Sequence, residues 1–167
     1  ATLRAFGYRD RGWPEDYDLV LRMLAAGERI GVVPRVLLRW RDRPDRLSRR
    51  HPAYALPRFV ECKAEFLAGG PLAGGDRYVL WGYGDTGKAL RRALGRHGKT
   101  PAAIVELHPG RLGQRIDGVA VVPPERVPDW RGTPLLASVA GAVARGQIRA
   151  ALAEMGWVET RDFWCTA

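Results

Sequence analysis

The stretch Tyr-Val-Leu-Trp-Gly-Tyr-Gly-Asp-Thr-Gly-Lys, residues 78–88, decides the fold of the longer part of this chain. Residues 78–81 are an apolar run of the kind that forms a buried parallel strand. Three glycines follow in the spacing G-x-G-x-x-G. Residues 89–94 then place apolar side chains on one helical face, and Gly98 can end that helix. We therefore predict a strand, a glycine turn and a helix in succession.

Each glycine of this turn has a function in binding a phosphate group. The first permits a tight turn, the second lets the backbone approach the ligand, and the third lets helix and strand pack closely. Backbone N–H groups and the helix dipole then favour an anion. The next predicted strand, 102–105, ends in an acid where a dinucleotide site places its ribose-binding carboxylate. The predicted ligand-binding residues are Gly82, Gly84, Asp85, Thr86, Gly87 and Glu106.

Two alternatives remain open for this turn. One is that the glycines only pack the helix against the sheet and bind nothing. The other is a P-loop, because residues 82–88 also match G-x-x-x-x-G-K. That motif needs Ser or Thr next, to hold Mg²⁺, and the chain has Ala89. This favours Lys88 as a solvated lysine of the first helical turn.

Strands and helices alternate through residues 77–167. Further strands are expected at 119–122, 134–139 and 163–165, a turn at 116–118, and a helix that ends at Gly156. This alternation predicts an α/β fold, a small Rossmann-like three-layer domain with a mainly parallel sheet. A Gly/Pro-rich segment, residues 69–76, precedes it and is expected to be an exposed linker.

Residues 1–68 are predicted to form a first part of helices and short strands. An irregular lead-in is followed by a helix at 13–26, whose first turn holds Glu15 and Asp16. Two short strands are expected at 30–33 and 36–40. A charged loop follows at 41–51, and the apolar residues between 56 and 67 outline a second helix.

The composition limits the classes of partner. Net charge is +9, but only three of the 27 basic residues are lysine and the charge is spread along the chain, so we expect no specific nucleic-acid partner. The arginine bias resembles the codon usage of a GC-rich bacterial genome. No apolar run is long enough for a transmembrane segment. Cys62 and Cys165 are too far apart for a metal motif, and their presence as lone cysteines is typical of a cytoplasmic protein.

Three segments of the first part resemble the C-terminal end of an inverting, bacterial family-2 glycosyltransferase: residues 12–19 (Gly-Trp-Pro-Glu-Asp-Tyr-Asp-Leu), 36–41 and 46–48. The resemblance implies that Asp16, in the Glu15-Asp16 pair, is the general base that deprotonates the acceptor hydroxyl. It implies a nucleotide-sugar donor and a sugar acceptor as partners. The family's Asp-x-Asp motif and donor-binding strands lie before this helix, so we expect them, with a divalent metal, only in a longer protein. This chain alone is expected to be inactive.

The second part, residues 77–167, is similar to Rossmann-like domains such as the N-terminal domain of bacterial sugar O-acyltransferases. The similarity rests on the glycine turn, residues 116–121 and the ending helix–Gly156–strand. It implies a nucleotide, a nucleotide-sugar or NAD as ligand. Our leading hypothesis is thus a glycosyltransferase fragment with an appended nucleotide-binding domain. The alternative is a non-catalytic, NAD- or nucleotide-binding regulatory module.

Overall fold

The computed structural model describes residues 2–39, 41 and 43–167. The chain divides into two compact units, Ala1–Phe66 and Leu67–Ala167. The division falls within one helix, α4 (Leu56–Gly69), slightly before the boundary that the sequence suggested. Each unit is described separately below.

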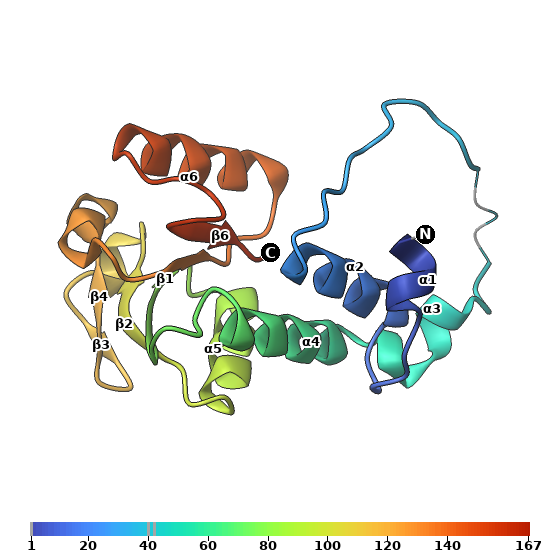
Figure 1. Cartoon of the computed structure of the whole chain (residues 1–167). Helices are drawn as coiled ribbons and strands as arrows, with labels where there is room; N and C mark the ends of the chain where they lie inside the picture. The colour runs from blue at the N-terminus through green and yellow to red at the C-terminus, as the bar shows by residue number, and fades with distance from the viewer. Residues whose placement is uncertain (1, 40, 42) are drawn as a thin grey trace. The chain divides into compact units, whose positions relative to one another are not determined.

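The second unit is built on one six-stranded sheet (Figure 1). The strands lie in the order β3-β4-β2-β1-β5-β6, and every neighbouring pair is parallel except β3 with β4. The fold class is therefore α/β with a mainly parallel sheet, as predicted. The strands are β1 (Arg77–Trp81), β2 (Thr100–Val105), β3 (Arg115–Ile116), β4 (Val119–Val122), β5 (Leu135–Ala137) and β6 (Phe163–Cys165).

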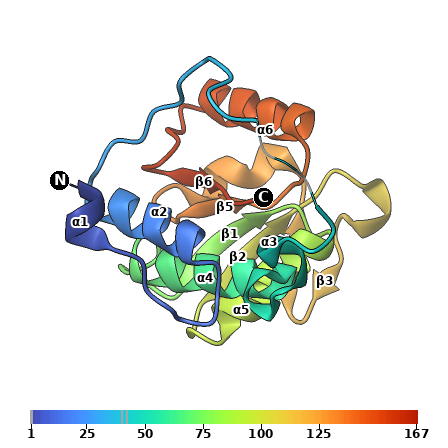
Figure 2. The same cartoon turned by 90° about the vertical axis from the view of Figure 1, so that its right-hand side faces the viewer.

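Helices cover the sheet on both faces. Figures 1 and 2 show α5 (Asp85–Gly95) and α6 (Ala142–Glu154) on opposite sides of the strands, which gives the expected three layers. Two short 3₁₀ segments, η2 (Pro109–Arg111) and η3 (Pro124–Trp130), connect the strands near one edge. The central strands are buried on both faces, as apolar parallel strands are. Val79, Leu135 and Leu152 are among the residues of this core that are completely buried.

The sheet has a topological switch point beside its central strand. From β1 the chain runs through α5 to β2 and then to the β3–β4 hairpin on one side. It returns through η3 to β5 on the other side of β1. Ligands of open α/β sheets bind in the crevice that such a reversal leaves at the carboxyl ends of the strands. The glycine turn lies at this end of β1.

Residues 69–76, predicted as an exposed linker, form a series of turns in which one side chain is buried. Leu72 is 1% exposed, and its N–H donates to the Leu67 carbonyl. The ammonium group of Lys99 donates to the carbonyls of Leu72 and Gly75, at 2.7 Å each. These contacts all lie within the second unit, so this segment is anchored to the sheet domain. Whether it also separates two independent domains stays a prediction.

The described residues of the first unit form helices joined by irregular segments, and no strand. Its helices are α1 (Thr2–Phe6), α2 (Glu15–Ala25), α3 (Leu47–Arg50), the 3₁₀ turn η1 (Pro52–Tyr54) and the first part of α4. The two helices predicted from sequence are present as α2 and α4. Pro14 precedes α2 as its N-cap, and Glu15 and Asp16 occupy the first turn.

Three sequence predictions in this unit are wrong. Residues 30–33 and 36–39 form no strand; Val32 is 92% exposed and Val36 82%, while Trp40 lies outside the described residues. A β-strand needs a neighbouring strand for its backbone hydrogen bonds, and the described part of this segment has none. The lead-in contains α1 instead of being irregular throughout, and the charged loop contains α3. The amino-acid composition of these two segments did not indicate either short helix.

Candidate functional site

Two of the three glycines of the turn are required by the fold. Gly82 has φ +94°, and a Cβ there would lie 2.4 Å from Cγ2 of Val139. A Cβ on Gly87 would lie 2.1 Å from the carbonyl oxygen of Gly82. Real Cβ atoms do not approach other atoms so closely, so the turn and α5 can pack against β1 only without these side chains.

Gly84 differs from the other two glycines. Its φ is −75°, which any residue can adopt, and a Cβ there would meet nothing within 4 Å. The packing of the protein does not require a glycine at this position. An absent side chain facing open space is what the second glycine of a phosphate-binding turn provides.

Helix α5 begins directly after Gly84 with its N-terminus uncapped. Among the residues that the structure describes, no side chain caps this terminus by a hydrogen bond. The first N–H groups of a helix have no partner within the helix, and they carry the positive end of the helix dipole. The helix is 11 residues long, so this positive end is well developed.

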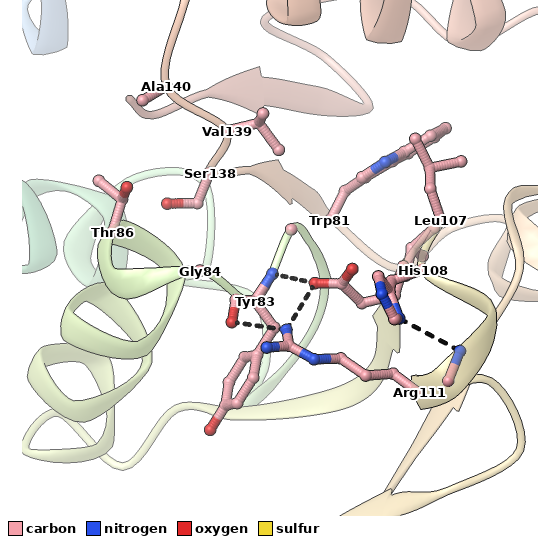
Figure 3. Close-up of a pocket in the computed structure, with 14 residues that line it drawn as sticks. Trp81, Tyr83, Gly84, Thr86, Leu107, His108, Arg111, Ser138, Val139 and Ala140 are labelled. Carbon is pink, nitrogen blue, oxygen red and sulfur yellow. Dashed lines mark hydrogen bonds and ion pairs between the residues drawn. The ribbon is translucent and has the colours of Figure 1, made fainter.

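A cavity of about 620 Å³ opens in front of this helix terminus (Figure 3). It lies at the carboxyl ends of β1, β2 and β5, which is the crevice at the switch point of the sheet. The polar side chains and backbone that matter for a ligand come from the glycine turn, β2 with the loop after it, and the end of β5: Gly82, Gly84, Thr86, Glu106, Arg111 and Ser138.

Glu106 fastens the glycine turn from the neighbouring strand. Its Oε1 accepts a hydrogen bond of 2.7 Å from the N–H of Tyr83. Nη1 of Arg111 lies 3.4 Å from the same oxygen and donates to the Tyr83 carbonyl at 3.2 Å. No donor is assigned to Oε2 of Glu106 among the described residues. Oε1 of the predicted ribose-binding carboxylate is thus hydrogen-bonded within the protein, and Oε2 is available to accept a hydrogen bond from a ligand.

Ser138 is the most informative residue that the sequence did not single out. It follows β5, is 3% exposed, and its N–H donates to the carbonyl of Trp81. Its hydroxyl is buried and has no hydrogen-bond partner within the described chain. Figure 3 shows Ser138 and Thr86 on one side of the cavity, across from His108 and Arg111. Because buried hydroxyl groups nearly always form hydrogen bonds, this one is suited to a ligand.

The other predicted ligand residues do not line the cavity. Gly87 packs against Gly82, as described above. Asp85 is exposed, and its carboxylate lies 3.9 Å from Nζ of Lys88. Lys88 does not line the cavity either, so the structure gives no support to the P-loop alternative. Asp85 and Lys88 are solvated residues of the first turn of α5.

The proposed catalytic pair of the first unit is divided between two environments. Asp16 is exposed, and its Oδ1 accepts a hydrogen bond from the N–H of Tyr17 at 2.7 Å. Glu15 is half-buried and accepts a hydrogen bond of 2.6 Å from the Tyr54 hydroxyl, which raises the pKa of Tyr54. Glu15 and Tyr54 line a separate hollow of about 320 Å³, together with Trp13. Asp16 does not line this hollow, and its role as a base stays a prediction.

The buried carboxylate of this helix is instead Asp18. It is completely buried, and both oxygens accept hydrogen bonds from Arg9 at 2.8 Å. Nε of Arg22 and Nε1 of Trp13 also donate to it, at 2.7 and 3.1 Å. Burial raises the pKa of Asp18, but these hydrogen bonds outweigh burial and lower its pKa to about 2. Asp18 therefore stabilises the fold.

Within the part of the chain that the structure describes, no group of three or more His, Cys, Asp or Glu side chains could hold a metal ion. Nor is any helix there both long enough and apolar enough to cross a bilayer.

Comparison with known proteins gives two similar solved structures. No family model matches the sequence, and no curated protein matches it. A crystal structure of RSP in complex with beta-NADH is 17% identical, with a TM-score of 0.43, and the match covers 64% of this chain and 54% of that one. A structure of RSP with beta-NAD⁺ and operator DNA is 16% identical, with a TM-score of 0.42, over 63% and 57%. This chain matches little more than half the length of either structure.

Proposed function

We propose that the second unit, residues 67–167, is a binding module for a nucleotide that contains a diphosphate, either NAD or a nucleotide-sugar. One observation carries the proposal: the glycine turn leads into an uncapped helix terminus, which opens into a cavity containing the unpartnered hydroxyl of Ser138. The fold leaves unsatisfied hydrogen-bond donors at the same place. A diphosphate is the ligand whose oxygens satisfy them.

The diphosphate is expected beside Gly84. There the backbone is accessible because no Cβ covers it, and the N–H groups of α5 begin. Ser138, on the same side of the cavity as Thr86, would donate its hydroxyl proton to a phosphate oxygen. Arg111, 41% exposed in its side chain, adds positive charge at the rim. Dipole, hydroxyl and guanidinium all favour an anion in this part of the cavity.

The nucleoside is expected near Glu106. Its Oε2 has no assigned donor in the described chain and can accept a hydrogen bond from a ribose hydroxyl. Apolar groups of Trp81, Leu107 and Val139 line the cavity and can contact a base. A volume of about 620 Å³ is in the usual range for a small-molecule site.

Binding without catalysis is the simpler function for this site. Glu106, His108 and Tyr83 are the titratable candidates for proton transfer in the described cavity. The hydroxyl of Tyr83 accepts a hydrogen bond from Arg91, which does not line this cavity. Glu106 accepts a hydrogen bond from the N–H of Tyr83, and Nδ1 of His108 accepts one from Gly110. Glu106 thereby holds the glycine turn in place, and His108 holds the loop that follows β2. We therefore favour a regulatory or binding role, in which the module binds its ligand without transforming it.

Calorimetric titration of the whole chain with NAD, UDP-glucose and ATP tests the proposal. We expect saturable binding of at least one dinucleotide or nucleotide-sugar, which Gly84→Val abolishes. Valine fits the backbone and the empty space at this position but would occupy the path of the diphosphate. Gly146→Ala in α6, which also meets nothing within 4 Å, is the matched control. Absence of binding to all three ligands, or equal binding by Gly84→Val, would contradict the proposal.

A second candidate function, glycosyl transfer by a longer protein, is supported by the exposed carboxylate of Asp16 in the first turn of α2, where the resemblance implies a general base. Its test is Asp16→Asn in a longer protein that supplies a donor site. Loss of a general base typically lowers the rate ~10²–10⁴-fold while donor binding stays near normal. Glu15→Gln is the control and should have a smaller effect. Undiminished turnover of Asp16→Asn would contradict this role.

A further inference from the structure

A second hollow, of about 530 Å³, lies at the amino ends of the strands of the same sheet, opposite the end that carries the glycine turn. It is bounded by the second half of α5, the amino ends of β1 and β2, and the turn of the β3–β4 hairpin. Four basic side chains line it, from four different segments: Arg77, Arg91, Lys99 and Arg115. One carboxylate, Asp117, lines it with them.

Arg91 has its charge compensated and its position fixed. Its Nη1 lies 3.1 Å from Oδ2 of Asp117 and donates to the hydroxyl of Tyr83 at 2.8 Å. The side chain of Arg91 is 15% exposed, while that of Asp117 is 78% exposed. Asp117 belongs to the hairpin turn, where its φ is +48°. The hollow therefore has one cation whose orientation is set before any ligand arrives.

The other three cations contact only neutral oxygen atoms. Lys99 donates to two backbone carbonyls, and Arg115 donates to the Gly118 carbonyl at 2.7 Å. Arg77 lies 3.5 Å from the hydroxyl oxygen of Thr100. Among the described residues, no carboxylate is assigned as an ion-pair partner to any of the three. A carbonyl or hydroxyl orients a cation without neutralising it, so the hollow retains an excess of positive charge.

We propose that this basic hollow binds a small polyphosphate anion. Guanidinium groups form bidentate, charge-assisted hydrogen bonds with phosphate oxygens, and three arginines surround this space. The basic residues surround a single hollow instead of following a strip of surface, and its volume is in the range for small ligands. These features favour a compact anion over the backbone of a nucleic acid. The site is distinct from the cavity at the glycine turn.

Calorimetric titration of the whole chain with inorganic tripolyphosphate at low salt tests the assignment. We expect a saturable site that persists in Gly84→Val, where the cavity at the glycine turn is blocked. Arg77→Gln with Arg115→Gln should weaken binding about tenfold or more, because each lost charged hydrogen bond has a large effect on affinity. Arg77→Gln alone should also weaken binding, and this single change removes no strong internal bond. Thermal unfolding identifies any variant that fails to fold.

Two controls locate the binding. Arg126→Gln removes the same charge from η3, where Arg126 pairs with Asp129 outside this hollow, and should leave the affinity unchanged. Gly84→Val blocks the other cavity and should leave it unchanged as well. The proposal is overturned by the absence of saturable binding, by equal weakening in Arg126→Gln, or by loss of binding in Gly84→Val. It is also overturned if duplex DNA, and not tripolyphosphate, binds in a way that depends on Arg77 and Arg115.

Discussion

At the scale of single residues, the glycine turn combines positions that the fold requires with one position that it leaves free. Gly87 fits because its Cα lies against the carbonyl of Gly82, where a Cβ would be only 2.1 Å away. At Gly84 a Cβ would contact nothing. Packing therefore requires a glycine at position 87, whereas at position 84 only ligand binding requires one.

This difference predicts unequal effects on stability for alanine substitutions at the two positions. Gly87→Ala should lower the free energy of unfolding by roughly 1–3 kcal/mol, because the turn or α5 must move to make room. Gly84→Ala should change it much less, because Ala meets no clash and its poorer N-cap propensity is largely offset by the lower conformational entropy of the unfolded chain. Denaturant unfolding of both variants measures the difference. Similar losses of stability would show that the turn does not pack as described.

At the scale of elements, the carboxylate of Asp18 joins α2 to the segment before it. Arg9 and Arg22 both donate to Asp18, and Arg22 also donates to the carbonyls of Phe6 and Gly7, at 2.7 and 2.6 Å. A single ionised group thus orients two arginines that hold the end of α1 near α2. Replacing it removes the compensating charge from both arginines.

This network predicts a loss of stability in acid. The pKa of Asp18 is about 2 in the folded chain, below its ordinary value of 3.8, so its contribution is present above pH 3.8. The contribution, roughly 2 kcal/mol, is lost as the pH falls from about 4 to 2. Asp18→Asn should destabilise the first unit at pH 7 and remove this part of the pH dependence. Thermal unfolding between pH 2 and 7 checks both.

The exposed neighbour provides the control for this experiment. Asp16→Asn, two residues earlier on the same helix, should leave the melting curve nearly unchanged at every pH. An Asp18→Asn protein as stable as the wild type at pH 7 would contradict the role of the network.

The sheet domain could be predicted from sequence because its signals are local. The apolar run before Gly82 gave β1, and the Asp117-Gly118 pair gave the hairpin turn, where both residues have positive φ. The segment 30–39 could not be predicted in the same way. Its residues favour strands, but a strand also needs a partner, and composition cannot supply one.

The site was only partly predictable for a similar reason. Gly82, Gly84, Thr86 and Glu106 belong to one strand–turn–helix–strand pattern, and all four line the cavity. Ser138 comes from a strand that is adjacent to β1 only in space. The available signal was its position at the end of a predicted strand of a parallel sheet, because the carboxyl ends of such strands meet at one edge.

At the scale of the whole molecule, the chain combines a helical unit with a sheet unit that carries two hollows of different character. One hollow presents unsatisfied donors at a helix terminus, and the other presents uncompensated cations. Both hollows are suited to phosphate groups, so evidence that a nucleotide binds does not by itself identify the site. The proposed function requires that the nucleotide binds at the glycine turn.

The most direct measurement of that location is an ¹⁵N–¹H NMR titration of the whole chain with NAD. We expect the largest amide shifts at Gly84, Thr86 and Ser138, because these residues line the cavity at the predicted diphosphate position. Gly146, in α6, should not shift. Unchanged spectra at saturating NAD and nucleotide-sugar, or shifts confined to the residues around Arg115, would contradict the assignment of the glycine turn as the nucleotide site.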